Sequence, residues 1–392
     1  MSSISPASIS TAVVSDMDAM RLAIRLAMLG RGAVEPNPMV GCVIAKGGRI
    51  IGQGYHKIFG GPHAEPLALA NCRESPTGAT AYVTLEPCCH LKKKTPPCVP
   101  QLIRAGLANV LCGSLDPNPL VSGQGLSQLR ADGIFAKDGL MAPEARQLNA
   151  AFFKQMDHRR PYVTLKWAQT ADGKVAGVGG KRMYISSEQS LAALHVLRSR
   201  CDAILVGIRT VLADDPQLTA RLAAPSSYRP LRRIVLDPDL RIPLTSQLAR
   251  TTVHGPVTVY CSNESYRRKF AGIAALNAAG IEVMPLPPDP AGGLSLEHML
   301  DDLGGRSVSH LLVEPGPTLA GSFLRLNLVD RVWIFHSPRR VGDAAAPSAA
   351  KLRFPVSGKV MLGGDQLTEH LNPQSPVFFA LEKSADLVLT TA

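Results

Sequence analysis

Aromatic residues, charged residues and long apolar runs are all scarce in this sequence. Hydrophobic residues make up 45% of the 392 positions and charged residues only 19%, a balance that excludes a disordered chain. No apolar run reaches the roughly 18 residues expected of a membrane-spanning helix. Aromatic residues are 5% of the chain, few for the base-stacking surface of an RNA-binding protein. We therefore expect a globular protein that binds neither membranes nor nucleic acid.

Cysteine is also scarce, and no targeting segment is evident. Eight cysteines in 392 residues are far fewer than a disulfide-stabilised scaffold carries. Residues 1–16 are rich in serine but contain no Lys or Arg and no apolar core, so we expect a disordered extension and not a signal or transit peptide. A reducing, cytoplasmic location is the default expectation, and clustered cysteines there are more commonly metal ligands than disulfides.

Positive charge is in modest excess, with 42 Lys and Arg against 31 Asp and Glu. The surplus of 11 is spread over short clusters along the chain. It is too dilute to predict a nucleic-acid surface by itself. Small anionic ligands, such as phosphorylated metabolites, suit this charge distribution equally well.

Length and local pattern predict two α/β units. A chain of 392 residues exceeds one typical domain. Residues 40–45 and 49–54 are two predicted strands, joined by a Gly-Gly hairpin turn. The polar segment 157–161 precedes a new strand and marks a domain boundary. We therefore expect a first unit over 17–157 and a second over 158–392.

Helices and strands alternate through both predicted units, which is the pattern of a sheet covered by helices. The expected helices are at 16–29, with Asp16 as the N-cap, and at 63–71, 98–105, 188–199 and 318–326. A helix and a strand together fill 124–135, and 286–293 is a Pro/Gly-rich loop. The other expected strands are at 80–85, 109–113, 162–168, 203–207, 233–237, 257–261, 310–314 and 332–336.

A His-x-Glu triplet followed by two Pro-Cys dipeptides predicts a zinc site. His63, Cys88 and Cys98 make a three-ligand zinc shell that leaves a fourth position for water. Zinc lowers the pKa of such a water, so that hydroxide exists at neutral pH. Glu65 lies two residues from a ligand, where it can move protons without binding the metal. The alternative is a surface histidine with cysteines that only fill the core.

The residues around this site resemble the deaminase half of the bifunctional deaminase/reductase family of riboflavin biosynthesis. The resemblance rests on residues 35–43, 85–90, 95–98 and 116–119. It implies a three-layer fold like that of cytidine deaminase. The roles that it implies are zinc ligation by His63, Cys88 and Cys98, proton transfer by Glu65 and pyrimidine contact by Asn37.

One departure from the family concerns the spacing of the cysteines. The family places eight residues between them, around a Gly-Arg pair, whereas nine separate Cys88 from Cys98 here and Lys92 to Lys94 occupy that loop. Cys89 would restore the usual spacing, but the Pro-Cys dipeptide and the following His90 favour Cys88. A reductase whose deaminase unit is impaired is therefore the nearest alternative.

The second unit resembles the reductase half of the same family. The matching segments are residues 165–174, 198–221 and 314–330. Apart from the resemblance, residues 311–321 form a predicted strand that turns through glycine into a helix start, where free backbone N–H groups hold phosphate. The resemblance implies an α/β domain like that of dihydrofolate reductase, which uses NADPH to reduce the ribosyl group of the deaminated pyrimidine.

The resemblance also implies which residues of the second unit hold each ligand. Arg182 and Tyr184 depart from the family, which has a small hydroxyl residue and a tryptophan at these positions. The implied substrate residues, with the arginines suited to a phosphate, are Lys166, Arg198, Leu218, Arg221 and Glu314. The implied NADPH residues are Ala168, Tyr184, Thr210, Asp214, Gly316, Pro317, Thr318, Leu319, Ala320, Gly321 and Ser322.

These features together predict a two-domain enzyme that depends on Zn²⁺ and NADPH. By resemblance it deaminates 2,5-diamino-6-ribosylamino-4(3H)-pyrimidinone 5′-phosphate and then reduces the ribosyl side chain to give 5-amino-6-ribitylamino-uracil 5′-phosphate. We expect phosphorylated pyrimidines as its small-molecule partners, and a homo-oligomeric state. The alternative from another class is an RNA-binding protein built on a deaminase-like unit, which the low aromatic content disfavours.

Overall fold

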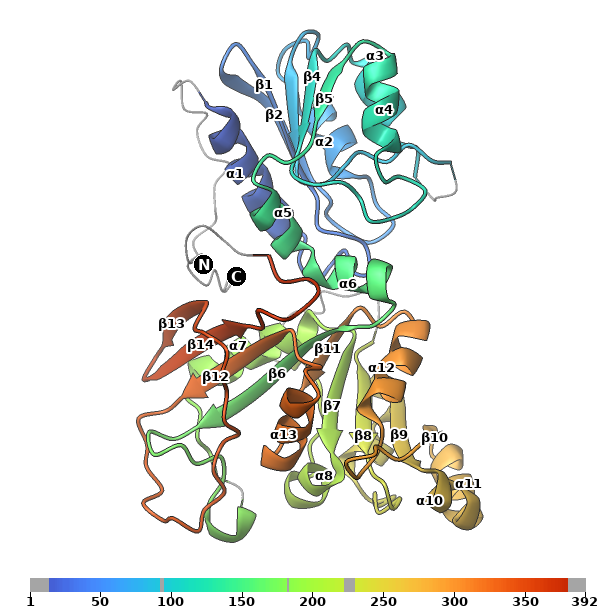
Figure 1. Ribbon diagram of the computed structural model, residues 1–392, viewed down its shortest axis with the longest axis vertical. Coiled ribbons are helices and arrows are strands. Elements are labelled where there is room, and N and C mark those ends of the chain that lie inside the picture. The colour runs from blue at the N-terminus through green and yellow to red at the C-terminus, as the bar shows by residue number, and fades with distance from the viewer. Residues whose placement is uncertain (1–13, 92–94, 182, 222–229, 380–392) are drawn as a thin grey trace. The chain divides into compact units, whose positions relative to one another are not determined.

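The computed structural model describes residues 14–91, 95–181, 183–221 and 230–379 (Figure 1). Most of the predicted N-terminal extension lies outside the described residues, as do Lys92 to Lys94 and Arg182. The chain divides into two compact units, of which the first runs to Asp157 and the second begins at His158. No helix in the described ranges is long and apolar enough to span a membrane.

The first unit is built on a five-stranded sheet in the order β2-β1-β3-β4-β5. β2 and β3 run antiparallel to β1, whereas β3, β4 and β5 are parallel. The strands are β1 (Gly41–Lys46), β2 (Arg49–Tyr55), β3 (Thr80–Val83), β4 (Asn109–Cys112) and β5 (Phe135–Lys137). The helices are α1 (Asp16–Met28), α2 (Ala64–Ala70), α3 (Val99–Arg104), α4 (Gln124–Ala131), α5 (Ala142–Leu148) and α6 (Ala150–His158).

Side-chain alternation along β1 builds a hydrophobic layer on each face of this sheet. Val43 and Ala45 lie in one cluster with Met20 of α1. Cys42 and Ile44 lie in another, with residues of α2, α3 and α4. Successive side chains of a strand point to opposite faces, so β1 contributes to both layers. This three-layer arrangement confirms the predicted cytidine-deaminase-like fold.

The start of α1 differs from the prediction. Ser15, and not Asp16, is the N-cap, and its hydroxyl oxygen accepts a hydrogen bond from the Asp18 backbone N–H. Asp16 is the first helical residue, and its carboxylate accepts a hydrogen bond of 2.6 Å from the Tyr82 hydroxyl. Serine and aspartate are both good N-caps, so the sequence alone left the choice between neighbours open.

Two glycines of β2 allow this strand to pack closely against α2. A Cβ atom at Gly54 would lie 2.6 Å from the Ala64 carbonyl oxygen, and one at Gly52 would lie 2.5 Å from that of Ala68. Side chains do not approach backbone oxygens so closely, so any larger residue would push the two elements apart. These glycines therefore help to set the position of α2.

The second unit is built on a nine-stranded sheet in the order β10-β9-β8-β7-β11-β6-β12-β14-β13. The strands from β10 to β12 in this order are parallel, and the β14 and β13 pairings are antiparallel. The strands are β6 (Tyr162–Gln169), β7 (Ala203–Gly207), β8 (Arg232–Leu236), β9 (Val257–Ser262), β10 (Ile281–Leu286), β11 (His310–Val313), β12 (Arg331–His336), β13 (Gly358–Leu362) and β14 (Asp365–Leu371). The α-helices are α7 (Glu188–Ser199), α8 (Ile208–Asp214), α9 (Gln247–Arg250), α10 (Asn263–Arg268), α11 (Phe270–Ala278), α12 (Leu296–Gly305) and α13 (Pro317–Arg325).

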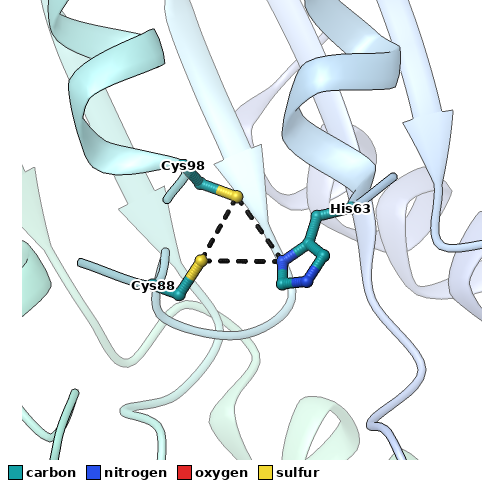
Figure 2. A group of neighbouring side chains, drawn as sticks. All are labelled: His63, Cys88 and Cys98. Atoms are coloured by element: carbon teal, nitrogen blue, oxygen red, sulfur yellow. Dashed lines mark hydrogen bonds between the residues drawn. The ribbon is translucent and has the colours of Figure 1, made fainter. Parts of the chain in front are cut away.

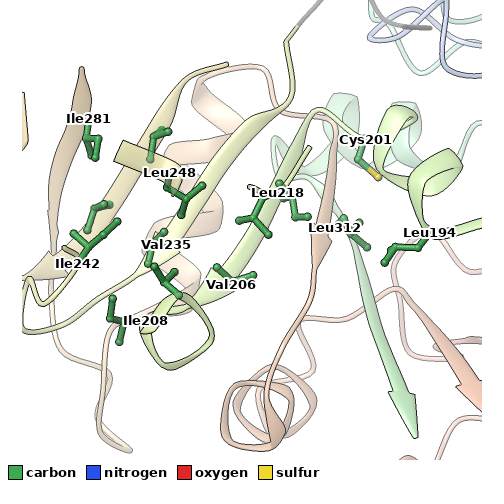
Figure 3. Close-up of a cluster of buried hydrophobic side chains, with 14 of the residues drawn as sticks. Leu194, Cys201, Val206, Ile208, Leu218, Val235, Ile242, Leu248, Ile281 and Leu312 are labelled. Atoms are coloured by element: carbon green, nitrogen blue, oxygen red, sulfur yellow. The ribbon is translucent and has the colours of Figure 1, made fainter. Parts of the chain in front are cut away.

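A hydrophobic layer covers each face of the second sheet. Figure 3 shows one layer, in which Val206 and Val235 of neighbouring strands lie in one cluster with Leu194 of α7. Leu205 and Ile234, the adjacent strand residues, belong to the other layer with residues of α12 and α13. Burial on both faces is typical of parallel strands. This layering agrees with the dihydrofolate-reductase-like α/β architecture that the resemblance implied.

A chain of hydrogen bonds crosses β6, β12 and β14 in one direction. Trp167 Nε1 donates to Gln169 Oε1 at 2.9 Å, which leaves Gln169 Nε2 facing His336 Nδ1 at 3.4 Å. His336 Nε2 lies 3.0 Å from Thr368 Oγ1, which lies 3.0 Å from His370 Nε2. His370 Nδ1 then lies 3.0 Å from a backbone carbonyl, which can only accept. Gln169 Nε2 can donate to His336 Nδ1 only when the His336 imidazole is neutral, because a protonated ring would place a second donor in this bond.

Candidate active sites

Three metal-ligating side chains converge in the first unit (Figure 2). His63 is the N-cap of α2, Cys98 is the N-cap of α3, and Cys88 lies in the loop after β3. The two sulfur atoms are 3.4 Å apart, and they lie 3.6 Å (Cys88) and 3.5 Å (Cys98) from His63 Nδ1. Tetrahedral zinc, with bonds of about 2.3 Å to sulfur and 2.0 Å to nitrogen, places its ligand atoms roughly 3.5–3.8 Å apart. The donor set and its spacing fit zinc.

The backbone closes the lengthened loop between the two cysteines. The Cys98 and Val99 backbone N–H groups both donate to the Cys88 carbonyl oxygen, at 3.0 and 3.2 Å. These bonds hold the two ends of the loop together whatever residues lie between them. The Cys89 sulfur lies 3.8 Å from the Leu120 carbonyl oxygen, outside the ligand group. It is therefore the Cys88 sulfur that lies beside His63.

Glu65 lies in the first turn of α2, two residues from His63. Its side chain is only 2% exposed, and its Oε2 atom has no hydrogen-bond partner among the described residues. Burial and the Cys88 sulfur raise the pKa of the Glu65 carboxyl, whereas His63 lowers it. A buried carboxyl with a raised pKa and an unused oxygen is suited to exchange protons with a bound substrate or water.

The ligand group opens into a cavity of about 330 Å³. Asn37 lines it, and Asn37 Nδ2 lies 3.2 Å from His56 Nε2. His56 Nδ1 lies 2.9 Å from the Pro62 carbonyl oxygen and must donate to it, so Nε2 accepts from Asn37. This arrangement leaves the Asn37 amide oxygen available to a ligand. Other polar residues of the lining are His90, Thr95, Asp116 and Asn118.

Asp116 is an acidic residue of this cavity to which the sequence prediction gave no role. Burial and the nearby Glu86 raise the pKa of Asp116 to about 7, against a backbone hydrogen bond from Asn118 that lowers it. The Glu86 carboxylate accepts hydrogen bonds from the backbone N–H groups of Asp116, Gly123 and Leu126 at 3.3, 2.9 and 3.2 Å. Glu86 therefore ties the loop that carries Asp116 to the start of α4.

The second unit brings four predicted substrate residues into one cavity of about 390 Å³. α7 contributes Arg198, the segment after α8 contributes Leu218 and Arg221, and the residue after β11 is Glu314. Thr210 and Asp214, which the sequence assigned to the cofactor, line the same cavity. Residues far apart in the sequence thus form a single site.

Arg198 and Glu314 form a bidentate ion pair in this cavity. Arg198 Nε and Nη2 donate to the two Glu314 oxygens at 2.7 and 2.9 Å, and Nη1 donates to the Thr219 carbonyl oxygen at 3.2 Å. Burial alone would raise the pKa of Glu314, but Arg198 and Lys166 hold it below its ordinary value. Arg221 donates through Nη1 to Gln217 at 2.8 Å. The Arg198 fork is therefore engaged by protein.

A neighbouring cavity of about 360 Å³ lies at the start of α13. Gly316 is the N-cap of this helix, and a Cβ atom there would meet nothing within 4 Å. Thr210 lines both this cavity and the previous one. Arg209, which also lines it, donates to Thr318 Oγ1 at 3.0 Å. The other predicted NADPH residues in the lining are Pro317, Thr318, Leu319 and Ser322, and two further arginines are Arg241 and Arg325.

Five of the ligand-binding residues predicted for the second unit are not among the described residues that line these two cavities. Lys166 lies with its Nζ atom 5.2 Å from the Phe335 ring centre, and burial and Arg198 lower its pKa while Glu314 raises it. Tyr184 is 67% exposed, and its carbonyl oxygen accepts a hydrogen bond from Arg339. The remaining three are Ala168 near the end of β6 and Ala320 and Gly321 within α13.

Comparisons with known proteins match both units. Residues 14–114 match the family described as the cytidine and deoxycytidylate deaminase zinc-binding region, and residues 161–357 match the RibD C-terminal domain. The riboflavin biosynthesis protein RibD of Aquifex aeolicus is 42% identical, over 84% of this chain and 88% of its own length. The RibD protein of Escherichia coli is 39% identical, over 83% and 88%.

Solved structures give the same result. RibD of Acinetobacter baumannii superimposes with a TM-score of 0.79 at 33% identity, covering 91% of this chain and 98% of its own. A Thermotoga maritima protein matches with a TM-score of 0.76, also at 33% identity and with the same coverage. It is described as a diaminohydroxyphosphoribosylaminopyrimidine deaminase/5-amino-6-(5-phosphoribosylamino)uracil reductase. Because these matches extend across both units, the chain belongs to the family of the riboflavin biosynthesis protein RibD.

Proposed function

We propose that the first unit deaminates 2,5-diamino-6-ribosylamino-4(3H)-pyrimidinone 5′-phosphate and that the second reduces the ribosyl side chain of the product with NADPH. Membership of the RibD family makes the chain a bifunctional deaminase and reductase of riboflavin biosynthesis. The observation that carries this function is the convergence of His63, Cys88 and Cys98 beside the buried Glu65. A reductase with an impaired deaminase unit is not favoured, because the lengthened loop still brings both cysteines to His63.

In the deaminase unit, His63, Cys88 and Cys98 would hold zinc. When bound, zinc supplies a Lewis acid that makes water nucleophilic at neutral pH. Glu65 would accept a proton from water and pass one to the departing amino group, which leaves as ammonia. The free amide oxygen of Asn37, fixed by His56, would accept a hydrogen bond from the pyrimidine.

In the reductase unit, the free N–H groups at the start of α13 would hold the diphosphate of NADPH. When bound, NADPH supplies the hydride that reduces the sugar carbon. Arg221 would bind the substrate phosphate, and Lys166 would place positive charge beside the reacting sugar. Arg209, Arg241 and Arg325 add positive charge around the cofactor cavity, which suits a phosphorylated cofactor.

A coupled assay tests both halves of this function. The full-length protein is supplied with zinc, the diamino-pyrimidinone phosphate and NADPH, while ammonia release and NADPH oxidation are followed separately. We expect ammonia release without NADPH, and NADPH oxidation only after deamination. NADH should be the poorer cofactor. Ammonia release without any later NADPH oxidation would contradict the reductase half.

We also propose that the two activities divide between Asp157 and His158, and that the protein works in a reducing compartment such as the cytoplasm. All eight cysteines are free of disulfide bonds, which supports that location. The predicted homo-oligomeric state is part of the proposal as well. Light scattering coupled to size-exclusion chromatography would measure it, and a mass near 41.7 kDa would indicate a monomer instead.

A further inference from the structure

We propose that Asn149 is a positioning residue of the deaminase unit, and that its side-chain amide holds the segment carrying Asn37 in place for the substrate. The inference rests on the proposed deaminase function and adds a residue to which the family resemblance gave no role. It starts from one observation: the Asn149 amide forms two hydrogen bonds with the backbone of Met39, 110 positions earlier in the sequence.

This pair of hydrogen bonds satisfies both backbone groups of a single residue. The Met39 N–H donates to Asn149 Oδ1 at 2.8 Å, and Asn149 Nδ2 donates to the Met39 carbonyl oxygen at 2.9 Å. A side-chain amide can do this because it carries an acceptor and a donor side by side. The Asn149 side chain is only 3% exposed. Buried backbone groups need such partners, so the contact fixes the course of the backbone at Met39.

Met39 lies inside a segment that forms one wall of the deaminase cavity. Its neighbours Pro38 and Val40 line this cavity together with Asn37, whereas Met39 is not among the described residues that do so. The Met39 side chain instead belongs to a buried cluster against which Leu148 of α5 packs. Met39 therefore attaches the segment to the junction of α5 and α6, and the residues on each side of it line the cavity.

Asn149 also stands at the start of a second wall of this cavity. It lies between α5 and α6, and its carbonyl oxygen accepts a hydrogen bond of 3.0 Å from the Phe153 backbone N–H of α6. The neighbouring residue of this helix, Phe152, lines the cavity. Through its side chain and its backbone, Asn149 thus links the segment that carries Asn37 to the helix that carries Phe152.

The placement of Asn37 depends on this link. His56 orients the Asn37 amide by accepting from Nδ2 at 3.2 Å, which leaves the amide oxygen for the pyrimidine. The Asn37 backbone N–H donates to the Val34 carbonyl oxygen at 2.9 Å, a bond that stays within the same stretch of chain. Loss of the Asn149 bonds would let the segment shift relative to the zinc ligands. A misplacement of about 1 Å can cost about 10²-fold in rate.

A double-mutant cycle in the full-length protein separates positioning from general stability. Asn149→Leu keeps a similar volume but removes both bonds to Met39, and Asn37→Ala removes the amide that is proposed to contact the pyrimidine. Ammonia release and zinc content are measured for the wild type, the two single variants and the double variant. The matched control is Asn109→Leu, which removes a hydrogen bond of 3.0 Å to Thr80 between β4 and β3 of the same unit.

We expect Asn149→Leu to raise the KM of deamination about tenfold, the effect of losing one hydrogen bond to the substrate. Its kcat should change little and its zinc should be retained, because the substitution acts on substrate binding. In the Asn37→Ala background the same substitution should have little further effect, since residues that act together are not additive. Asn109→Leu should leave the KM unchanged.

Three results would overturn the inference alone: a normal KM in Asn149→Leu, loss of its zinc, or fully additive effects in the cycle. Absence of ammonia release by the zinc-loaded wild type would overturn the proposed deaminase function and the inference with it.

Hydrogen exchange gives a second measurement that does not depend on activity. The Met39 amide proton, followed in short peptides by mass spectrometry, should exchange faster in Asn149→Leu than in the wild type. If Asn149→Leu does not fold, Asn149→Ser takes its place in both experiments, because its shorter side chain leaves room for water beside Met39. Equal exchange in the variant and the wild type would show that Asn149 does not hold the segment.

Discussion

At the scale of single residues, the role proposed for Glu65 depends on the ability of its carboxyl group to exchange a proton. Glu65→Gln keeps the side-chain size but removes the group that can exchange a proton. We expect this variant to keep its zinc while ammonia release falls by about 10²–10⁴-fold, the contribution of a positioned general acid–base group. Metal analysis and an ammonia assay on the same preparation measure both. The exposed Glu74 provides the control, since Glu74→Gln should behave like the wild type.

The choice of zinc ligands gives a second prediction at this scale. Cys88→Ser and Cys98→Ser should each lose most of the bound zinc, because each removes a thiolate from the three-ligand group. Cys89→Ser should keep about one zinc per chain, because its sulfur lies by the Leu120 carbonyl instead. Zinc content of the purified variants decides the matter. Loss in Cys89→Ser with retention in Cys88→Ser would show that the ligand assignment is wrong.

The hydrogen-bonded chain through His336 predicts a pH dependence of stability. Burial, and then the nearby His370, lower the pKa of His336 from its ordinary value of 6.5. The unfolded chain therefore binds this proton at a higher pH than the folded chain does. As pH falls below about 6.5, protonation favours the unfolded state, and the free energy of unfolding should decrease.

Tryptophan fluorescence isolates this effect. Both tryptophans, Trp167 and Trp333, lie in the second unit, so urea unfolding followed by fluorescence does not report on the zinc site. The urea midpoint of the wild type should fall between pH 7 and about pH 5.5. His336→Gln should weaken this dependence, whereas His254→Gln, a change at an exposed histidine, should preserve it. An unchanged pH dependence in His336→Gln would show that His336 is not the group responsible for it.

Local motifs made part of the sites predictable. His63, Glu65, Cys88 and Cys98 stand in short motifs whose residue types state their chemistry. Asp116, by contrast, has a raised pKa because the fold buries it in the cavity wall near Glu86, and no pattern of neighbouring residues encodes that burial. The sequence also could not show that Glu314, which lies 116 positions after Arg198, forms an ion pair with its guanidinium. Arg198 and Arg221 were therefore equivalent as predicted phosphate ligands.

At the scale of elements, the contact between β2 and α2 gives a stability prediction. Gly54→Ala places a methyl group where the Ala64 carbonyl oxygen leaves only 2.6 Å. We expect a loss of about 1–3 kcal/mol from overpacking. Zinc affinity should fall too, because α2 begins at His63. Gly272→Ala, in open space on α11, should instead stabilise by up to about 1 kcal/mol through helix propensity.

Thermal unfolding and zinc titration of the two glycine variants provide the measurements. If Gly54→Ala is as stable as the wild type and binds zinc as tightly, then α2 can move away from β2 without disturbing the site. That outcome would contradict the role given to this contact.

The elements themselves were predictable to different degrees. α7 and β7 have the predicted bounds because a capped amphipathic helix and an apolar strand have strong local signals. The pattern missed α5, α6, α8 to α12, β10, β13 and β14. Several of these are short or carry weak periodicity, and among the described strands β13 pairs only with β14. Tertiary packing, which a local pattern does not contain, decides the structure of such segments.

At the scale of the whole molecule, each unit contains its own site, and we expect the two activities to separate. Full-length Glu65→Gln should stop ammonia release yet reduce the already deaminated substrate at nearly the wild-type rate. The reason is that the described cavities of the second unit are lined by its own residues. NADPH oxidation with that substrate measures the second activity. Loss of reduction by a folded, zinc-loaded variant would show that the sites are coupled.

The strand order of the second sheet has a consequence for synthesis of the chain. Every strand of the first sheet has been made once residue 137 has emerged from the ribosome. β6 is the first strand of the second unit, yet it pairs with β11 and β12, and Thr164 lies 146 positions before its hydrogen-bonding neighbour His310. Contacts so distant in sequence form late. A nascent chain can therefore complete its zinc site while both edges of β6 are still unpaired, and β6 is the segment that a chaperone would have to shield.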